Sequence, residues 1–267
     1  SDCQKIVIEL IVFQKLERKL LIVLIIEILN SKYNLVFTPL FMLLLPISYG
    51  IMFAGKTGAE LRKLLKAEAM KNQKTLGYSR ARSEMYSYIY NDPDENAIYC
   101  VYTGSRMPCE YDSMDNQCNP KLNCEHTVPQ SFFGKKDPMV SDLHHLRSTW
   151  SDANGARSNF AFKLLEEGEA TQYYGNQFTK TTTRPIDVEN WSILKKGKNF
   201  EPRDAQKGDT ARAVAYFYTR YPTEAGSITK TFASVDDMID WDESFPPTAL
   251  NIKQYKKAVE VQGNINP

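Results

Sequence analysis

The sequence has no excess of charge of either sign, because 33 Lys and Arg are balanced by 32 Asp and Glu to leave a net charge of +1. Any basic surface for a polyanion must therefore be local. The chain also has no internal repeat and no low-complexity tract, and its hydrophobic fraction of 42% is that of an ordinary globular protein. These values argue against extended disorder, collagen-like repeats and a protein with several membrane spans.

Histidine is scarce. The three in the chain, His126, His144 and His145, lie within about twenty residues of one another. A random scatter would rarely produce such a cluster, so this stretch is the first indication of a functional site. The region carries no nucleophilic Ser or Cys motif, which argues against covalent catalysis.

The first 54 residues differ in composition from the rest. Residues 6–29 are apolar but contain six charged side chains, which argues against a membrane crossing. Residues 35–54 form a stretch of twenty residues without a charge, long enough to span a bilayer. We expect 35–54 to be a secretory signal peptide, with a retained membrane anchor or a buried core helix as the alternatives. Residues 1–34 are then a leader without an assigned role.

Four cysteines follow within 25 residues: Cys100, Cys109, Cys118 and Cys124. In an exported domain this number predicts two disulfides, for which three connectivities are open. Four free thiols are one alternative. Another is a zinc site that uses Cys118, Cys124, His126 and His144, although these residues lack the short paired cysteine spacing of typical zinc sites.

Residues 55–267 are predicted to form one α+β domain that is mainly helical, with a few strands near the histidines. Apolar residues at helical spacing predict helices around 61–69, over 79–90 and 208–221, and after the N-caps Ser234 and Thr248. The last helix is expected to face inward through Ile252, Tyr255 and Val259. A β-branched and aromatic stretch predicts a strand over 98–103.

The residues around the histidines combine a carboxylate, imidazoles, an amide and a guanidinium. The hard oxygen ligands of Glu125 and Asn154 suit Mg²⁺ or Ca²⁺. A neutral imidazole such as that of His126 can act as a general base toward water, and Arg157 offers a planar fork for phosphate. Together these groups suit the metal-assisted hydrolysis of a phosphodiester.

Three runs carry a resemblance to a known family: Glu125-His126-x-x-Pro129, Asp142-Leu143-His144 and Asn154-Gly155-x-Arg157-Ser158-Asn159-Phe160. They resemble the endonuclease I family of periplasmic and secreted nucleases. Residues 99–104, 129–134, 207–212 and 262–267 resemble further family segments in the expected order, so the resemblance covers roughly 56–267. It implies a ββα-metal (His-Me) finger embedded in a mainly helical single domain.

The resemblance also implies roles for individual residues. His126 would be the general base, and Glu125 and Asn154 would bind one Mg²⁺, with Mn²⁺ or Ca²⁺ as alternatives. The metal would stabilise the departing 3′ oxygen, and cleavage would leave a 5′-phosphate. In the family a long loop after the Glu-His pair often supplies a phosphate-binding Arg. Here that connection is short, so Arg157, or one of Lys135 and Lys136, is expected to take this role.

Two local patterns conflict with this assignment. Adjacent residues of a regular strand face opposite ways, so Glu125 and His126 share a site only where the strand ends or is distorted. Asn154-Gly155 by itself predicts a hairpin turn, whereas the family places this Asn on a helix. We expect the helix, with Ser151 as its N-cap.

Not every polar residue near the histidines is expected to react. Asp142 is predicted to be a structural hydrogen-bond acceptor. His144 is predicted to orient the fold or a neighbouring ligand through hydrogen bonds rather than to contact metal. The expected protein is a secreted or periplasmic endonuclease that cleaves DNA, and also RNA as a further substrate, with little sequence preference. The alternatives are a catalytically inactive nucleic-acid-binding domain of the same fold and a zinc-stabilised or membrane-tethered interaction module. The sequence indicates no obligate protein partner.

Overall fold

The structure, a computed structural model, describes residues 53–92, 94–109 and 120–267. The chain divides into the units Ser1–Gly55 and Lys56–Pro267, and the second holds every helix and strand named below. All of the leader 1–34 and residues 35–52 of the signal or anchor segment lie outside the described residues, so both stay predictions. In the part of the chain that is described, no helix has the length and hydrophobicity needed to cross a membrane.

The helices of the second unit follow the apolar spacing of the sequence. They are α3 (Gly58–Met70), α4 (Tyr78–Glu84), α5 (Ser151–Arg157), α6 (Asp204–Arg220), α7 (Val235–Ser244) and α8 (Ala249–Gln262). A π-helical turn, Met85–Ile89, continues α4, so the predicted helix over 79–90 is confirmed with a change of pitch. The caps of α7 and α8 are also confirmed, because the Ser234 and Thr248 side chains accept hydrogen bonds from backbone N–H groups of the first turns.

The buried face of α8 differs from the predicted one. Ile252 and Tyr255 are 43% and 36% exposed, whereas Gln254, Ala258 and Gln262 are buried. Residues four apart share one face of a helix, so these three form a single stripe. Hydrogen bonds of Gln262 to the rest of the domain favour this stripe, and such tertiary contacts leave no trace in the apolar spacing of the helix.

The strands form three small sheets. The first has the order β1-β2-β3 (Asn91–Asp92, Ala97–Tyr99, Arg106–Pro108). The second has the order β6-β10-β9-β7-β8 (Ala161–Phe162, Asn199–Glu201, Ser192–Lys195, Gln172–Gly175, Thr179–Thr181). The strand predicted over 98–103 is wrong in its second half, where the chain turns. The five-stranded sheet was not predicted, so the fold is a mixed α+β fold with more strand than expected.

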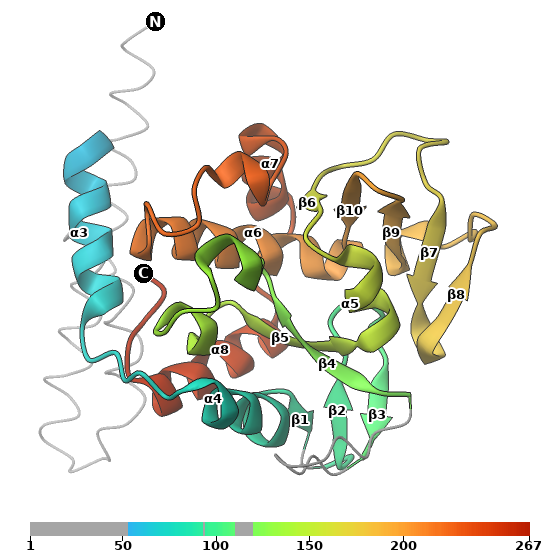
Figure 1. The fold of residues 1–267 in the computed structure, drawn as a ribbon, viewed down its shortest axis with the longest axis horizontal. Helices are drawn as coiled ribbons and strands as arrows, with labels where there is room; N and C mark the ends of the chain where they lie inside the picture. The colour runs from blue at the N-terminus through green and yellow to red at the C-terminus, as the bar shows by residue number, and fades with distance from the viewer. Residues whose placement is uncertain (1–52, 93, 110–119) are drawn as a thin grey trace, which may run out of the picture. The chain divides into compact units, whose positions relative to one another are not determined.

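The third sheet is the antiparallel pair β4 (Leu122–His126) and β5 (Leu146–Trp150), which pairs over its whole length. The helix α5 follows β5 without a loop, and it contacts β4, β5 and β9 (Figure 1). Asn154 therefore lies on a helix, as expected, rather than in a hairpin turn. The predicted N-cap was wrong by one position, because Trp150 is the capping residue and Ser151 begins the helix.

The helix α6 carries residues 207–212, one of the segments that resembled the family. Lys207 is buried and forms an ion pair with Glu201 at 2.6 Å. Gly208 lies against the chain after α7, where a Cβ atom would come within 1.9 Å of the Phe245 carbonyl oxygen. Arg212 donates to that same oxygen at 3.1 Å. The segment therefore fastens the end of α7 to α6.

Cys100 and Cys124 are buried free thiols, so the prediction of two disulfides among the four cysteines is wrong. The Cys100 sulfur accepts the backbone N–H of Trp150 at 3.0 Å, and Cys124 packs 3.8 Å from the Met85 sulfur. Both thiols are thus core residues. Cys109 is disulfide-bonded, and Cys118 lies outside the described residues.

The described residues also contain no group of three or more His, Cys, Asp and Glu that could hold a metal ion. Burial raises the pKa of the Cys124 thiol to about 12, so it is not a thiolate ligand at neutral pH. The zinc alternative therefore gains no support from this part of the chain.

The eight residues before α3, numbers 50–57, have the spacing G-x-x-x-x-G-K-T of a phosphate-binding loop. Such a loop needs a preceding strand and a lysine free to reach phosphate. Lys56 instead pairs with Glu60 at 2.6 Å, and residues 50–52 lie outside the described range. We assign no function to the pattern.

Candidate active site

The end of β4 and one side of α5 form a cleft of about 340 Å³. The structure brings all four predicted site residues to it, Glu125 and His126 from β4 and Asn154 and Arg157 from α5. The opposite wall is the 3-10 turn η2 (Gln130–Phe133) and the residues that follow it. Residues far apart in the sequence thus meet because β4 and β5 pair and α5 folds back on them.

Neighbouring Glu125 and His126 share the cleft because β4 ends at His126. Arg157 holds this strand end. Its Nη1 donates to the His126 carbonyl oxygen at 3.3 Å and lies 3.3 Å from Glu125 Oε1, and its Nη2 donates to the Thr127 carbonyl oxygen at 2.8 Å. One guanidinium therefore contacts three consecutive residues and sets their orientation.

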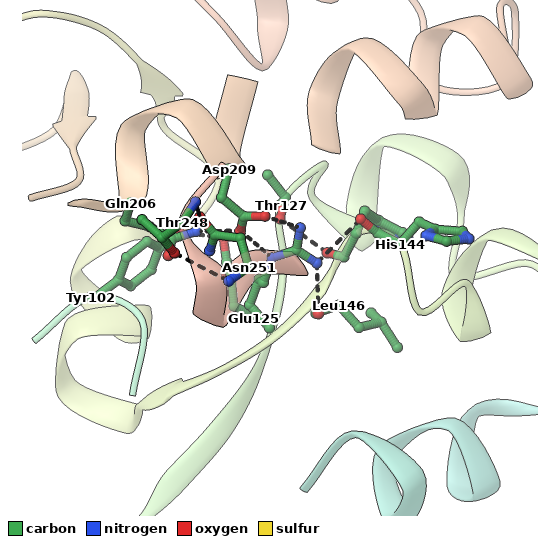
Figure 2. Close-up of polar contacts among 11 residues, drawn as sticks. Tyr102, Glu125, Thr127, His144, Leu146, Gln206, Asp209, Thr248 and Asn251 are labelled. Atoms are coloured by element: carbon green, nitrogen blue, oxygen red, sulfur yellow. Dashed lines mark hydrogen bonds and ion pairs between the residues drawn. The ribbon is translucent and has the colours of Figure 1, made fainter. Parts of the chain in front are cut away.

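The Glu125 carboxylate is buried, and burial raises its pKa above the ordinary value. Arg157 and a hydrogen bond from the Tyr102 hydroxyl to Oε1, 2.7 Å long, act in the opposite direction and favour the ionised form (Figure 2). The second oxygen, Oε2, has no hydrogen-bond partner among the described residues. Glu125 thus combines one anchored oxygen with one that can accept a ligand.

The His126 ring is 4% exposed and is fixed by a single hydrogen bond. Its Nε2 lies 3.1 Å from the Val140 carbonyl oxygen, and because a carbonyl only accepts, Nε2 carries the proton. The lone pair is then on Nδ1. Burial, and then repulsion from His145, lower the pKa of His126 to about 3, so the ring is neutral at physiological pH.

Aromatic rings surround His126 and limit its rotation. The rings of Tyr78, His145 and Phe133 lie 5.5, 5.5 and 6.2 Å from it, centroid to centroid. His145 is itself fully buried, with its Nε2 2.7 Å from the Met139 carbonyl oxygen. The sequence analysis assigned neither Tyr78 nor Phe133 to the site, although Phe133 lies in the segment 129–134 that resembled the family.

Asn154 Nδ2 donates to the Cys124 carbonyl oxygen at 3.4 Å, which leaves Oδ1 for other partners. Oδ1 of Asn154 and Oε2 of Glu125 are thus two hard oxygen atoms at one cleft, neither engaged by the described residues. Such a pair suits Mg²⁺ or Ca²⁺, which keep several waters and need few protein ligands. The donor set fits a divalent cation of this kind and does not fit zinc.

Arg157 and Lys135 are the cations of the cleft, and they differ in accessibility. Arg157 is 1% exposed. Its Nε has no hydrogen-bond partner among the described residues but is buried, above the Phe162 ring. Lys135 is exposed. The guanidinium of Arg157 is thus engaged by the strand end, whereas the side chain of Lys135 is open to solvent.

Residues 56–267 match the model of the Endonuclease I family. The chain belongs to this family. It is similar to the protein named extracellular ribonuclease of Bacillus subtilis (strain 168), with 26% identity over 174 residues, which is 64% of this chain and 53% of the relative. The extracellular ribonuclease of Bacillus amyloliquefaciens is 26% identical over 170 residues, 63% of this chain and 51% of the relative.

The protein named Endonuclease-1 of Buchnera aphidicola subsp. Acyrthosiphon pisum (strain APS) is 26% identical over 164 residues, 55% of this chain and 58% of the relative. This chain thus spans about half the length of the curated relatives that it matches. The residues that match the family model include every residue that lines the cleft.

Asp142 and His144 do not line the cleft of this member of the Endonuclease I family. The Asp142 carboxylate accepts hydrogen bonds from Tyr216, Tyr221 and Gln262, each 2.8 Å long. His144 Nε2 lies 3.0 Å from the carbonyl oxygen of Asn264. These contacts agree with the expectation that both residues form structural hydrogen bonds, and they connect residues 142–144 to residues 262–264.

Proposed function

We propose that this Endonuclease I nuclease is a divalent-metal-dependent endonuclease whose β4, β5 and α5 act as a ββα-metal (His-Me) finger. The observation that carries the proposal is one cleft with a neutral imidazole whose Nδ1 is free to accept a proton and with two unengaged oxygen atoms. These are the parts that hydrolysis of a phosphodiester by an activated water requires.

In the reaction, His126 Nδ1 accepts a proton from the attacking water, whose oxygen forms a bond to phosphorus. The bond between phosphorus and the 3′ oxygen breaks, and that oxygen takes a proton from solvent to leave a 5′-phosphate and a 3′-hydroxyl. The Val140 carbonyl keeps the required tautomer, and Arg157 keeps the strand end in place. Glu125 and Asn154 would hold a divalent cation, which when bound would neutralise charge at the phosphate.

The proposed substrates are DNA and RNA, cleaved with little sequence preference. One relative is named extracellular ribonuclease, which supports RNA as a substrate, and another is named Endonuclease-1, which supports cleavage within a nucleic-acid chain. Mg²⁺ is the proposed metal, with Mn²⁺ and Ca²⁺ as alternatives. We place the protein outside the cytoplasm, secreted or periplasmic, with residues 35–54 as signal peptide or anchor, since two relatives are named as extracellular.

Incubation of the protein with supercoiled plasmid, or with folded RNA, and Mg²⁺ tests this proposal. We expect both substrates to be degraded, no cleavage in EDTA, and recovery when Mg²⁺ is restored. His126→Ala should reduce kcat by about 10²–10⁴-fold, the usual contribution of a general base. Cleavage that survives both EDTA and His126→Ala would contradict the mechanism. A folded protein that binds the plasmid but leaves it intact would favour the inactive binding domain.

A further inference from the structure

Arg157 is the cation of the cleft whose terminal nitrogens are already occupied by contacts within the protein. The two terminal nitrogens of Arg157 contact the carbonyl oxygens of His126 and Thr127 and the Glu125 carboxylate. If Arg157 turned toward a phosphate, it would release the strand end and leave Glu125 buried without its cationic partner. Arg157 is therefore unsuited to bind substrate and must stay where it is for the site to keep its shape.

The second cation, Lys135, has the opposite properties. Its side chain is exposed and lines the cleft, and its amine forms no hydrogen bond or ion pair with the described residues. Gly134 and Lys135 both have left-handed backbone angles, with φ of 64° and 57°, and the Lys135 N–H donates to the Gln130 carbonyl oxygen at 3.0 Å. This turn brings Lys135 to the cleft and leaves Lys136, also exposed, outside its lining.

The distribution of charge in the cleft also favours Lys135 as the residue that meets a phosphate group. Apart from the imidazole of His126, the charged side chains that line the cleft are Glu125, Arg157 and Lys135. Glu125 and Arg157 are paired at 3.3 Å, so Lys135 supplies the unpaired positive charge. Resting on the proposed function, we propose that Lys135 is the residue that contacts the phosphate group being cleaved, and that Arg157 is a positioning residue.

The test compares Lys135→Asn with Lys136→Asn in the full chain, assayed on plasmid DNA with Mg²⁺. Asn tolerates the left-handed backbone of position 135, and each variant removes one exposed positive charge. We expect kcat/KM to fall about 30-fold or more for Lys135→Asn and by less than about twofold for Lys136→Asn. Lys135→Arg should recover most of the loss.

A second readout is the salt dependence, where the slope of log kcat/KM against log salt should become shallower by about one in Lys135→Asn alone. Circular dichroism and thermal unfolding establish that both variants are folded. Equal losses in the two variants would overturn the proposal in favour of general attraction. Full activity of Lys135→Asn would also overturn the proposal for Lys135. If His126→Ala is inactive in the same assay, the proposed function would still stand without a role for Lys135.

Discussion

His126 and His145 donate their Nε2 protons to successive carbonyl oxygens, those of Val140 and Met139, in the 3-10 turn η3 (Met139–Ser141). The turn therefore selects the tautomer of both rings, because each carbonyl can only accept. Residue types and spacing predicted a base at His126, but they carried no information about which nitrogen is free. That choice depends on a backbone atom fourteen residues away.

Asp142 is the residue at which pH should act on stability. Burial alone would raise its pKa, but His144, His145 and hydrogen bonds from Gln262 and Tyr221 outweigh burial and lower it below the ordinary value. A carboxyl group whose pKa is lower in the folded than in the unfolded state stabilises the fold above its unfolded pKa. This contribution is lost as the pH falls through the folded pKa.

We expect Asp142→Asn to lower the free energy of unfolding at pH 7 by about 3 kcal/mol, since a charged acceptor of several buried hydrogen bonds is lost. The difference in the free energy of unfolding between the variant and the unchanged protein should become smaller as the pH is lowered below about 4, because Asp142 is then protonated in the unfolded chain. Urea unfolding between pH 7 and pH 3 measures this gap. Asp240→Asn, an exposed residue of α7, is the matched control and should show no such narrowing. A gap independent of pH would refute the assignment.

At the scale of elements, the sequence located most helices but misjudged which face of α8 is buried and where β2 ends. Whether a segment forms a helix depends on the spacing of its apolar residues and on its capping residues, and both can be identified within a few residues of sequence. Burial of a face depends on partners elsewhere, such as the Leu143 backbone N–H that donates to Gln262 at 2.6 Å. The same reason explains why Cys100 and Cys124 stay free, because their positions in the core are set by distant packing.

Two glycines on helices should respond oppositely to the same substitution. Gly208→Ala would place a Cβ atom 1.9 Å from the Phe245 carbonyl oxygen, and the resulting separation of α6 from the chain after α7 should destabilise the protein by about 3 kcal/mol. Gly155→Ala in α5 meets no atom within 4 Å, so it should stabilise the helix by about 0.5–1 kcal/mol. Urea unfolding of both variants is the measurement. A Gly208→Ala protein as stable as the parent would refute the close approach.

For the whole molecule, the net charge of +1 limits how strongly the protein attracts nucleic acid. Binding should depend on a few local contacts such as Lys135, so we expect log Kd to change with log salt with a slope of roughly 1 to 3. Fluorescence anisotropy with a short duplex in Ca²⁺ and the His126→Ala variant, which keeps the substrate intact, measures it. A slope near zero would argue against a site that binds phosphate groups. A slope near that of a highly basic protein would indicate a larger basic surface than the net charge suggests.

The sequence by itself determined the family, the chemical types of the site residues and most helices, since these depend on local spacing and on ordered motifs. It also placed Glu125, His126, Asn154 and Arg157 in one site, and the cleft contains all four. Tertiary structure alone decided which contacts each of these side chains makes. The pairing of β4 with β5 turns Arg157 onto the strand end and leaves Lys135 exposed, because a buried guanidinium must satisfy its hydrogen bonds with whatever backbone the fold brings to it.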